Sequence, residues 1–194
     1  MSAFNTTAQD QILAAHNNLR SSIAKGTYVA RGVQKPAGKN ILKLVWNETL
    51  AASAQAWAEN CIFSNNNDRP GIGQNLYYSS IQSTKLDTYG VAASNNWGIE
   101  FQQFGWNGTV LLANMANAKS NVLHATQMVW AKTSSIGCGV QKCISRISSV
   151  ESVFVVCQYS PAGNFLGQNI YISGTTCSAC PTGTSCETAS GLCV

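Results

Sequence analysis

The chain has 194 residues and a mass of 20.7 kDa, which is the size of one domain or of one domain with a small appendage. Hydrophobic residues make up 45 % of the chain and charged residues only 10 %, a composition that excludes a disordered chain and a coiled coil. No apolar run approaches the roughly 18 residues of a membrane span. The net charge of +4 carries no Lys or Arg cluster, so we expect no nucleic-acid partner.

Apolar residues spaced three and four apart predict helices in the first two thirds of the chain. The segments are 9–24, 48–61, 86–104 and 118–131. Asn47 is the predicted N-cap of the second helix, because its side chain can accept from a backbone N–H of the first turn. Gly90 and Gly98 weaken the third prediction, since glycine is a poor helix former.

Strands are predicted after the helices. Ile136–Cys143 is short and contains glycines, whereas Val150–Ser160 is apolar and β-branched, as is typical of a buried strand. A third strand lies either at Ile170–Ser173 or near Leu76–Ser79. Helices followed by strands are typical of an α+β protein.

Eight cysteines indicate an oxidising compartment. Three Asn-x-Ser/Thr sequons, at Asn5, Asn47 and Asn107, point the same way, although such sequons also arise by chance in a chain rich in Asn and Thr. We therefore expect a secreted, extracellular glycoprotein. The first residues show no signal peptide, and we expect a mature chain from which the signal has been removed.

The composition changes near residue 173. The last 22 residues hold four cysteines between small residues and almost no apolar side chains. Such a segment cannot build a core, so we expect structural disulfides to hold it. The Cys177-x-x-Cys180 pair is also compatible with zinc or redox chemistry, but no histidine follows His124. We predict two units, a domain over 1–172 and a cysteine-rich, hinge-like extension over 173–194.

Only two histidines, His16 and His124, are available for acid–base or metal chemistry. His124 stands one helical turn before Gln127, and Glu100 ends the preceding predicted helix. A carboxylate that fixes an imidazole suits acid–base or metal chemistry, and it equally satisfies a buried polar pair; the residues alone favour the structural interpretation. The chain has no P-loop, Gly-x-Ser-x-Gly or His-Glu-x-x-His motif.

Four stretches together resemble the ordered motifs of the CAP superfamily, which includes cysteine-rich secretory, antigen 5 and pathogenesis-related 1 proteins. Each motif is short, but the order and spacing extend over about residues 8–172, and residues 136–140 fit as well. The cysteine-rich end is most similar to the nematode activation-associated secreted proteins. The stretches are His16–Arg20, Gly73–Leu76, His124–Trp130 and Phe154–Phe165.

The resemblance implies an α-β-α sandwich with a central three-stranded antiparallel sheet between helical layers, plus the disulfide-rich extension. It also implies that Cys61 pairs with Cys143 and Cys138 with Cys157. In the extension, the hinge-like spacing suggests Cys177–Cys186 and Cys180–Cys193, although the sequence leaves other pairings open.

Many CAP proteins carry a central cleft with two histidines and two acidic residues that binds zinc in some members. Here His124 and Glu100 match two of the four positions. Gln74 stands in place of the second acid, and residues 64–67 supply no histidine. Because zinc needs three or four ligands, we predict no metal site and no cofactor, and we assign no catalytic residue.

The remaining polar motif residues are expected to hold the fold together. His16, Asn17 and Arg20 would tie the first helix to its neighbours. The five tryptophans are expected in the core. The residues expected to tie loops to the sheet are Asn75, Gln127, Tyr159 and Asn164.

Two functions remain open. The first is a secreted, non-enzymatic protein of a parasitic nematode that binds an unknown host protein and modulates immunity. The second is a sterol or fatty-acid carrier with an apolar surface near the cleft, although neighbouring tyrosines on a strand would point to opposite faces. A homodimer is compatible with the low charge. The lipid-contact candidates are Leu76, Tyr77, Tyr78, Ile81 and Tyr89.

Overall fold

The computed structural model describes residues 3–116, 121–144 and 151–194. Its α-helices follow the sequence predictions closely at the beginning of the chain and less closely later. Asn5 caps the first helix by accepting from the backbone N–H of Ala8 at 2.9 Å, which starts it three residues before the predicted position. The helices are α1 (Thr6–Ala24), α2 (Glu48–Glu59), α3 (Thr88–Gly98), α4 (Glu100–Phe104) and α5 (Leu123–Val129), with a 3₁₀ turn at Ala113–Ala116.

Two helix predictions need correction. The single helix expected over 86–104 is two helices, because α3 ends at Gly98 and α4 begins at Glu100. The helix expected over 118–131 is the shorter α5, and residues 118–120 lie outside the described residues. It ends early because Trp130 adopts an extended ψ of 112°, and a buried arginine takes up carbonyl groups of its last turn.

The central sheet has the strand order β3-β5-β6-β4. Three long strands are antiparallel, as the resemblance implied, but Val45–Trp46 joins β5 in parallel and makes a fourth. Of the two segments considered for the third long strand, 73–80 forms it. The segment 170–173 instead forms isolated contacts, including the bridge between Gly38 and Ser173. The strands are β3 (Val45–Trp46), β4 (Gly73–Ser80), β5 (Ser135–Ile144) and β6 (Glu151–Ser160).

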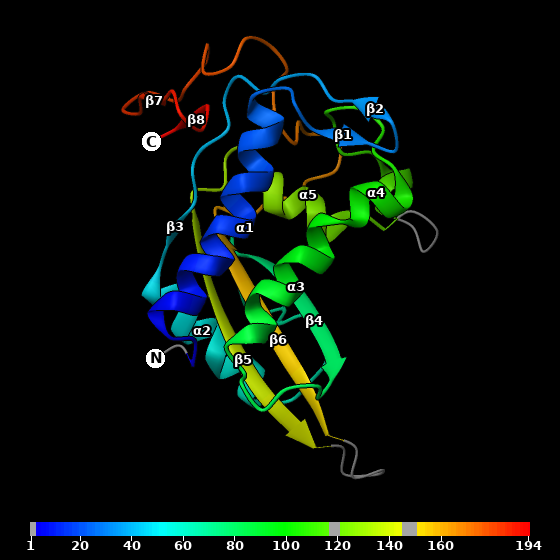
Figure 1. Cartoon of the computed structure of the whole chain (residues 1–194), viewed down its shortest axis with the longest axis vertical. Coiled ribbons are helices and arrows are strands. Elements are labelled where there is room, and N and C mark those ends of the chain that lie inside the picture. The colour runs from blue at the N-terminus through cyan, green and yellow to red at the C-terminus, as the bar shows by residue number, and fades with distance from the viewer. Residues whose placement is uncertain (1–2, 117–120, 145–150) are drawn as a thin grey trace.

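Figure 1 shows the layers of the molecule: α1 and α3 lie on one side of the sheet and α2 on the other. Glycines on β5 bring α2 close. A Cβ atom at Gly137 would lie 2.2 Å from the backbone nitrogen of Ala51, and one at Gly139 would lie 2.4 Å from the Cα of Gln55. No helix among the described residues is long and apolar enough to cross a membrane.

Arg20 of α1 is completely buried and donates to carbonyl oxygens of two other segments. Its Nε donates to Leu42 at 2.8 Å, Nη1 donates to Met128 at 2.9 Å and Trp130 at 3.0 Å, and Nη2 donates to Thr133 at 2.9 Å. Burial lowers its pKa to about 9. The guanidinium therefore joins α1 to the loop at Leu42 and to the segment 128–133. The structural role expected for Arg20 is confirmed.

His16 lies one turn before Arg20 and is also fully buried. Its Nδ1 lies 2.8 Å from the carbonyl oxygen of Ile12, which can only accept, so Nδ1 carries the proton. Nε2 then accepts from the hydroxyl of Tyr159 at 2.9 Å, and that hydroxyl accepts from Asn75 at 3.2 Å. Burial lowers the pKa of His16 to about 4. We call His16, Arg20, Asn75 and Tyr159 the polar interior.

The structure contains four disulfides, with the same pairs that the sequence analysis set out. Cys61–Cys143 closes a loop with a sequence separation of 82 residues, a cross-link that the chain-entropy account values at about 4–5 kcal/mol. The other pairs are Cys138–Cys157, Cys177–Cys186 and Cys180–Cys193.

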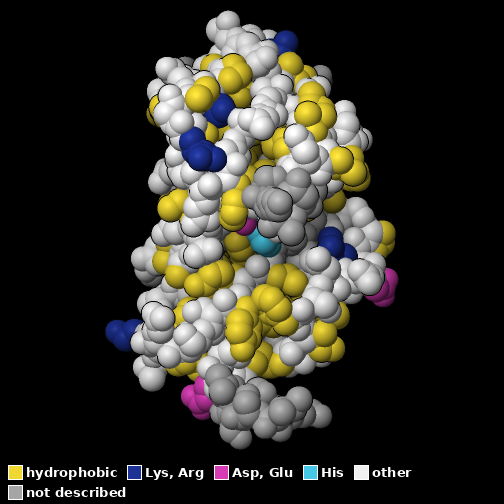
Figure 2. All heavy atoms as spheres, turned by 90° about the vertical axis from the view of Figure 1, so that its right-hand side faces the viewer, with side chains coloured by type: hydrophobic (Ala, Val, Ile, Leu, Met, Phe, Trp, Pro, Cys, Tyr) yellow, Lys and Arg dark blue, Asp and Glu magenta, His cyan; other side chains and the backbone are white. Residues whose placement is uncertain are grey.

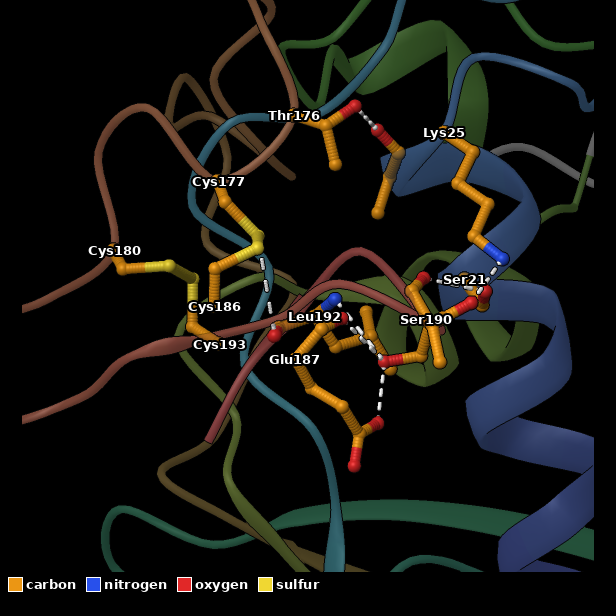
Figure 3. Close-up of a disulfide and its surroundings, with 12 residues drawn as sticks. Ser21, Lys25, Thr176, Cys177, Cys180, Cys186, Glu187, Ser190, Leu192 and Cys193 are labelled. Atoms are coloured by element: carbon orange, nitrogen blue, oxygen red, sulfur yellow. Dashed lines mark hydrogen bonds between the residues drawn. A yellow bond between two sulfur atoms is a disulfide. The ribbon is translucent and has the colours of Figure 1, made fainter.

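The C-terminal extension lies against the end of α1, and Figure 3 shows these contacts. Ser21 donates to the carbonyl of Ser190 at 2.6 Å, and Thr176 donates to the carbonyl of Ala24 at 2.8 Å. Leu192 is completely buried in the main core. The two disulfides expected to hold this segment are present, and Leu192 anchors it in addition, a contact that the sequence analysis did not expect. It carries two short hairpin strands, β7 (Cys186–Glu187) and β8 (Leu192–Cys193).

A second small hairpin lies at the other side of α1. It pairs β1 (Val29–Ala30) with β2 (Val33–Gln34). Of the five tryptophans, Trp97, Trp106 and Trp130 are buried in the main core, which confirms the expectation for these three. Trp46 and Trp57 are only partly buried and pack against the core from outside.

Candidate functional site

A cavity of about 540 Å³ opens beside the first half of β4. Its walls come from β4, from α5 and from the loops on either side. Figure 2 shows a histidine side chain within a hollow of this face. We call this cavity the cleft. It is lined by Phe63, Ser64, Asn65, Arg69, Ile72, Gly73, Gln74, Asn75, Leu76, Asn121, Leu123, His124, Gln127, Ala162, Gly163 and Asn164.

His124 of α5 and Glu100 of α4 meet at the cleft, as the sequence suggested. The imidazole Nδ1 lies 2.5 Å from Glu100 Oε1, and the second carboxylate oxygen accepts from the backbone N–H of Ala125 at 3.0 Å. The ring of Trp97 stacks on the imidazole at a centroid distance of 6.0 Å. These contacts fix the orientation of the ring, and 31 % of the His124 side chain stays exposed.

Gln74, the third candidate, lies on β4 in the wall of the cleft. Its Oε1 accepts from the backbone N–H of Asn66 at 3.0 Å. The backbone nitrogen can only donate, so the amide orientation is settled and Nε2 points away from Asn66. That Nε2 is buried and has no hydrogen-bond partner among the described residues.

Gln127, one of the residues that line the cleft, forms hydrogen bonds with two neighbouring loops. Its Oε1 accepts from the backbone N–H of Gly163 at 2.9 Å, and its Nε2 donates to Thr133 at 3.2 Å. A Cβ atom at Gly73 would lie 2.1 Å from Gln127 Oε1, so a larger residue there would displace the Gln127 amide from its hydrogen bonds. Gln127 therefore has a structural role, but it ties two loops to α5, whereas the sequence analysis expected a tie to the sheet.

Asn164 has a similar role at the edge of the cleft. Its Oδ1 accepts from the hydroxyl of Thr126 at 2.7 Å, and its Nδ2 donates to the carbonyl of Leu123 at 2.7 Å. Both partners belong to α5. The loop after β6 is thus fixed to that helix through both ends of the amide.

The residues of the cleft do not fit a metal ion. They supply one imidazole, and the carboxylate behind it has both oxygens engaged by protein donors, whereas zinc sites need three or four ligands. Among the described residues, the one group of three potential ligands close enough for a metal is Cys177, Cys180 and Cys193. All three are in disulfides.

Arg69 is a cleft residue that the sequence analysis missed. It is partly buried, its Nη1 donates to the carbonyl of Ile72, and its buried Nε has no partner among the described residues. Partial burial lowers its pKa from the ordinary value. The available signal was its position as the single cation in a loop of Asn, Gly and Pro residues that leads into the Gly73–Leu76 motif.

The five lipid-contact candidates do not gather in one place. Tyr77 and Ile81 pack against the main core, whereas Leu76 packs against a smaller cluster and lines the cleft. Tyr89 is buried, and its hydroxyl accepts from the backbone N–H groups of Gln82 and Ser83.

Tyr78 is half exposed and belongs to a separate apolar pocket of about 170 Å³ beside the Cys61–Cys143 disulfide. Its ring lies 5.0 Å from that of Phe63, which in turn lies 5.2 Å from Phe154. The sequence analysis missed both phenylalanines. The pairing of Tyr78 with Phe154 across β4 and β6 depends on the sheet register.

The three sequons differ in their surroundings. Asn5 and Asn47 are N-caps, and the side-chain nitrogen of Asn5, the atom to which a glycan would attach, donates to Asp87 at 2.8 Å. Asn107 is exposed between elements. Of the three, Asn107 therefore offers the amide that is least involved in the fold.

Comparison with known proteins places this architecture in a family. The sequence profile of the Cysteine-rich secretory protein family, CAP, matches residues 13–159. The chain is 35 % identical over 192 residues to Ancylostoma secreted protein of Ancylostoma caninum, covering 96 % of this chain and 44 % of that protein.

Two solved structures have the same fold over nearly the whole chain. "Crystal Structure of Na-ASP-1" superposes with a TM-score of 0.90 at 32 % identity and covers 100 % of this chain and 49 % of that one. "Crystal structure of NaASP2 with Zn2+" gives 0.87 at 32 % identity, covering 98 % and 97 %. This chain thus spans less than half the length of two of these relatives. On the profile, the identities and the shared fold, it belongs to the cysteine-rich secretory protein (CAP) family.

Proposed function

We propose that this chain is a secreted, non-enzymatic binding protein of a parasitic nematode that acts at the host interface, where it binds a host protein and modulates immunity. The similarity to Ancylostoma secreted protein supports an extracellular parasite protein. Four disulfides suit the same compartment. None of the three relatives named above is named as an enzyme.

The main support for this proposal is the cleft, where polar side chains form hydrogen bonds that hold the surrounding loops in place. Gln127 forms its hydrogen bonds with neighbouring loops, and Asn164 forms its hydrogen bonds with α5. Among the described residues, the side-chain hydrogen-bond partner of His124 is a carboxylate, and no hydroxyl or thiol is bonded to it. A nucleophile beside a base is what hydrolytic catalysis needs. An open cleft that mixes polar and apolar side chains serves recognition.

The test uses the purified, disulfide-intact protein, labelled and titrated onto host immune cells. Binding should saturate, and unlabelled wild-type protein should compete. Asn65→Arg and Asn121→Arg change two exposed residues of the cleft rim and should compete at least about tenfold less well. Ser178→Arg adds the same charge on the exposed extension and serves as the matched control. Equal competition by all three variants contradicts a role for the cleft.

A lipid carrier is the second candidate, favoured by the apolar pocket around Tyr78. Three aromatic rings and a disulfide line it. Its volume of about 170 Å³ is below the roughly 300–1,000 Å³ typical of ligand pockets, which makes it small for a whole sterol or fatty acid.

Titration with labelled cholesterol and a long-chain fatty acid separates the two candidates. A carrier should saturate near one equivalent per chain, and Tyr78→Ala should abolish saturation. Tyr77→Ala, on the opposite face of β4, is the comparison variant. The absence of binding at tens of micromolar ligand would leave the host protein as the target.

A further inference from the structure

The wall of the cleft has hydrogen-bond donors that the protein itself does not use. Gln74 Nε2 is buried without a partner among the described residues, and its amide cannot turn over without losing the bond from Asn66 to Oε1. Most buried polar groups in folded proteins are paired, so an exception at a cavity calls for a physical reason. A ligand acceptor supplies one.

Arg69 provides the second set of donors. Its Nη1 donates to the carbonyl of Ile72, which leaves the edge formed by Nε and Nη2. That edge holds two parallel N–H bonds and fits the two oxygens of a carboxylate. Nε is buried without a partner, and Arg69 forms no ion pair with any described residue. Arg69 is therefore a partly buried cation without an ion-pair partner in the described part of the chain.

The charge of the lining favours an anion. Arg69 is its single charged residue apart from the titratable His124, and no Asp or Glu is among the lining residues. Glu100 lies behind His124 with both oxygens engaged and only 11 % of its side chain exposed. Asp68, next to Arg69 in the sequence, is exposed and does not line the cavity. Gln74 adds donors without negative charge.

We infer that the cleft binds a carboxylate, which accepts hydrogen bonds from Arg69 and Gln74. The two unpaired nitrogens are covered in this structure, so the ligand binds as these side chains turn toward the cavity that they line, and at Gln74 its hydrogen bond replaces the one from Asn66. The carboxylate is either that of a free organic acid or an acidic group of a peptide. The inference does not depend on a host protein being the partner.

The experiment is a titration of ¹⁵N-labelled protein, followed through the side-chain signals of Gln74 and Arg69. The probes are succinate and a blocked peptide, Ac-Gly-Glu-Glu-Gly-NH₂. Saturable shifts of both signals below about 10 mM probe are expected. Shifts with both probes support a free acid as ligand, and shifts with the peptide alone support a peptide. The absence of saturation with either probe overturns the inference.

Variants decide whether these two residues make the site. Arg69→Gln and Gln74→Glu should each weaken probe binding at least about tenfold, the second because it places a like charge opposite the ligand. Lys85→Gln removes the same charge as Arg69→Gln at an exposed position outside the cleft and should bind as wild type. Unchanged binding in both cleft variants overturns the inference. No host protein is present, so this result is independent of the cell-binding test.

Discussion

The polar interior and the cleft both rely on an arginine, but they use it differently. Arg20 is completely buried, and its three nitrogens all donate to backbone carbonyls. Arg69 donates from Nη1 and keeps an unpaired Nε. A buried donor without a partner costs about 1–3 kcal/mol. The protein itself satisfies the nitrogens of Arg20, whereas the unpaired Nε of Arg69 fits a hydrogen bond to the ligand proposed above. The use of donors thus separates a structural arginine from one available to a ligand.

Exchanging each arginine for methionine should give the largest contrast. Arg20→Met leaves the carbonyls of Leu42, Met128, Trp130 and Thr133 without their donor and should lower the free energy of unfolding by about 4 kcal/mol. Arg69→Met removes one hydrogen bond to Ile72 and should cost about 1 kcal/mol. Guanidinium chloride unfolding with the disulfides intact measures both. Equal losses would show that the two arginines do not differ in their structural role.

A similar contrast, here between a buried and an exposed apolar residue, exists within the C-terminal extension. Leu192 is completely buried in the main core, whereas Val194 is 50 % exposed. Leu192→Ala should therefore destabilise the protein by about 3 kcal/mol, and Val194→Ala by less than about 0.5 kcal/mol. If Leu192→Ala has no effect on the unfolding of residues 1–172, the extension is a separate unit, as the sequence analysis proposed.

The polar interior should also make the stability depend on pH through His16. Burial lowers the pKa of His16 from its ordinary 6.5 to about 4, so between these values the unfolded chain binds the proton more readily than the folded protein. The free energy of unfolding should therefore fall by about 3 kcal/mol as the pH drops from 6.5 to 4.

The measurement is the difference between wild type and His16→Gln at pH 7 and pH 4, since other groups titrate equally in both proteins. The stability advantage of wild type should shrink toward pH 4. A difference that is constant over this range would mean that the imidazole is not desolvated.

The smallest effect on stability is expected for the pair of His124 and Glu100. Glu100→Gln keeps one acceptor oxygen, so either the N–H of Ala125 or Nδ1 of His124 loses its partner, at a cost of about 1 kcal/mol. Asp10→Asn, on the exposed side of α1, removes the same charge as a control. Thermal unfolding compares the two. A loss as large as that of Arg20→Met would place Glu100 with the polar interior.

Local patterns predicted much of the fold. The apolar, β-branched character of 151–160 predicted β6, and the capping side chain of Asn47 predicted the start of α2. Helix ends were harder to predict because their causes are not local. α5 ends where Arg20, more than a hundred residues earlier, takes the carbonyls of Met128 and Trp130.

The candidate site was predictable to the extent that it repeats known motifs. His124 and Glu100 were expected as neighbours and lie 2.5 Å apart. Arg69 was not expected, because a lone arginine in a polar loop is ordinarily a solvated surface residue. Its position in the wall of the cleft and the burial of its Nε appear only in the folded chain.

The sequence by itself determined the family, the places of α1, α2, β5 and β6, and, through the family motif, the loss of an acid at Gln74, because these depend on residue type and spacing. The tertiary structure decided which polar groups are satisfied. Hydrogen bonds such as those from Arg20 to Thr133, more than a hundred residues apart, and from Asn66 to Gln74, across a loop, require donor and acceptor to be placed to within a few tenths of an ångström. No local pattern contains those distances, so the contrast between a complete interior and an incomplete cleft appears only in the folded chain.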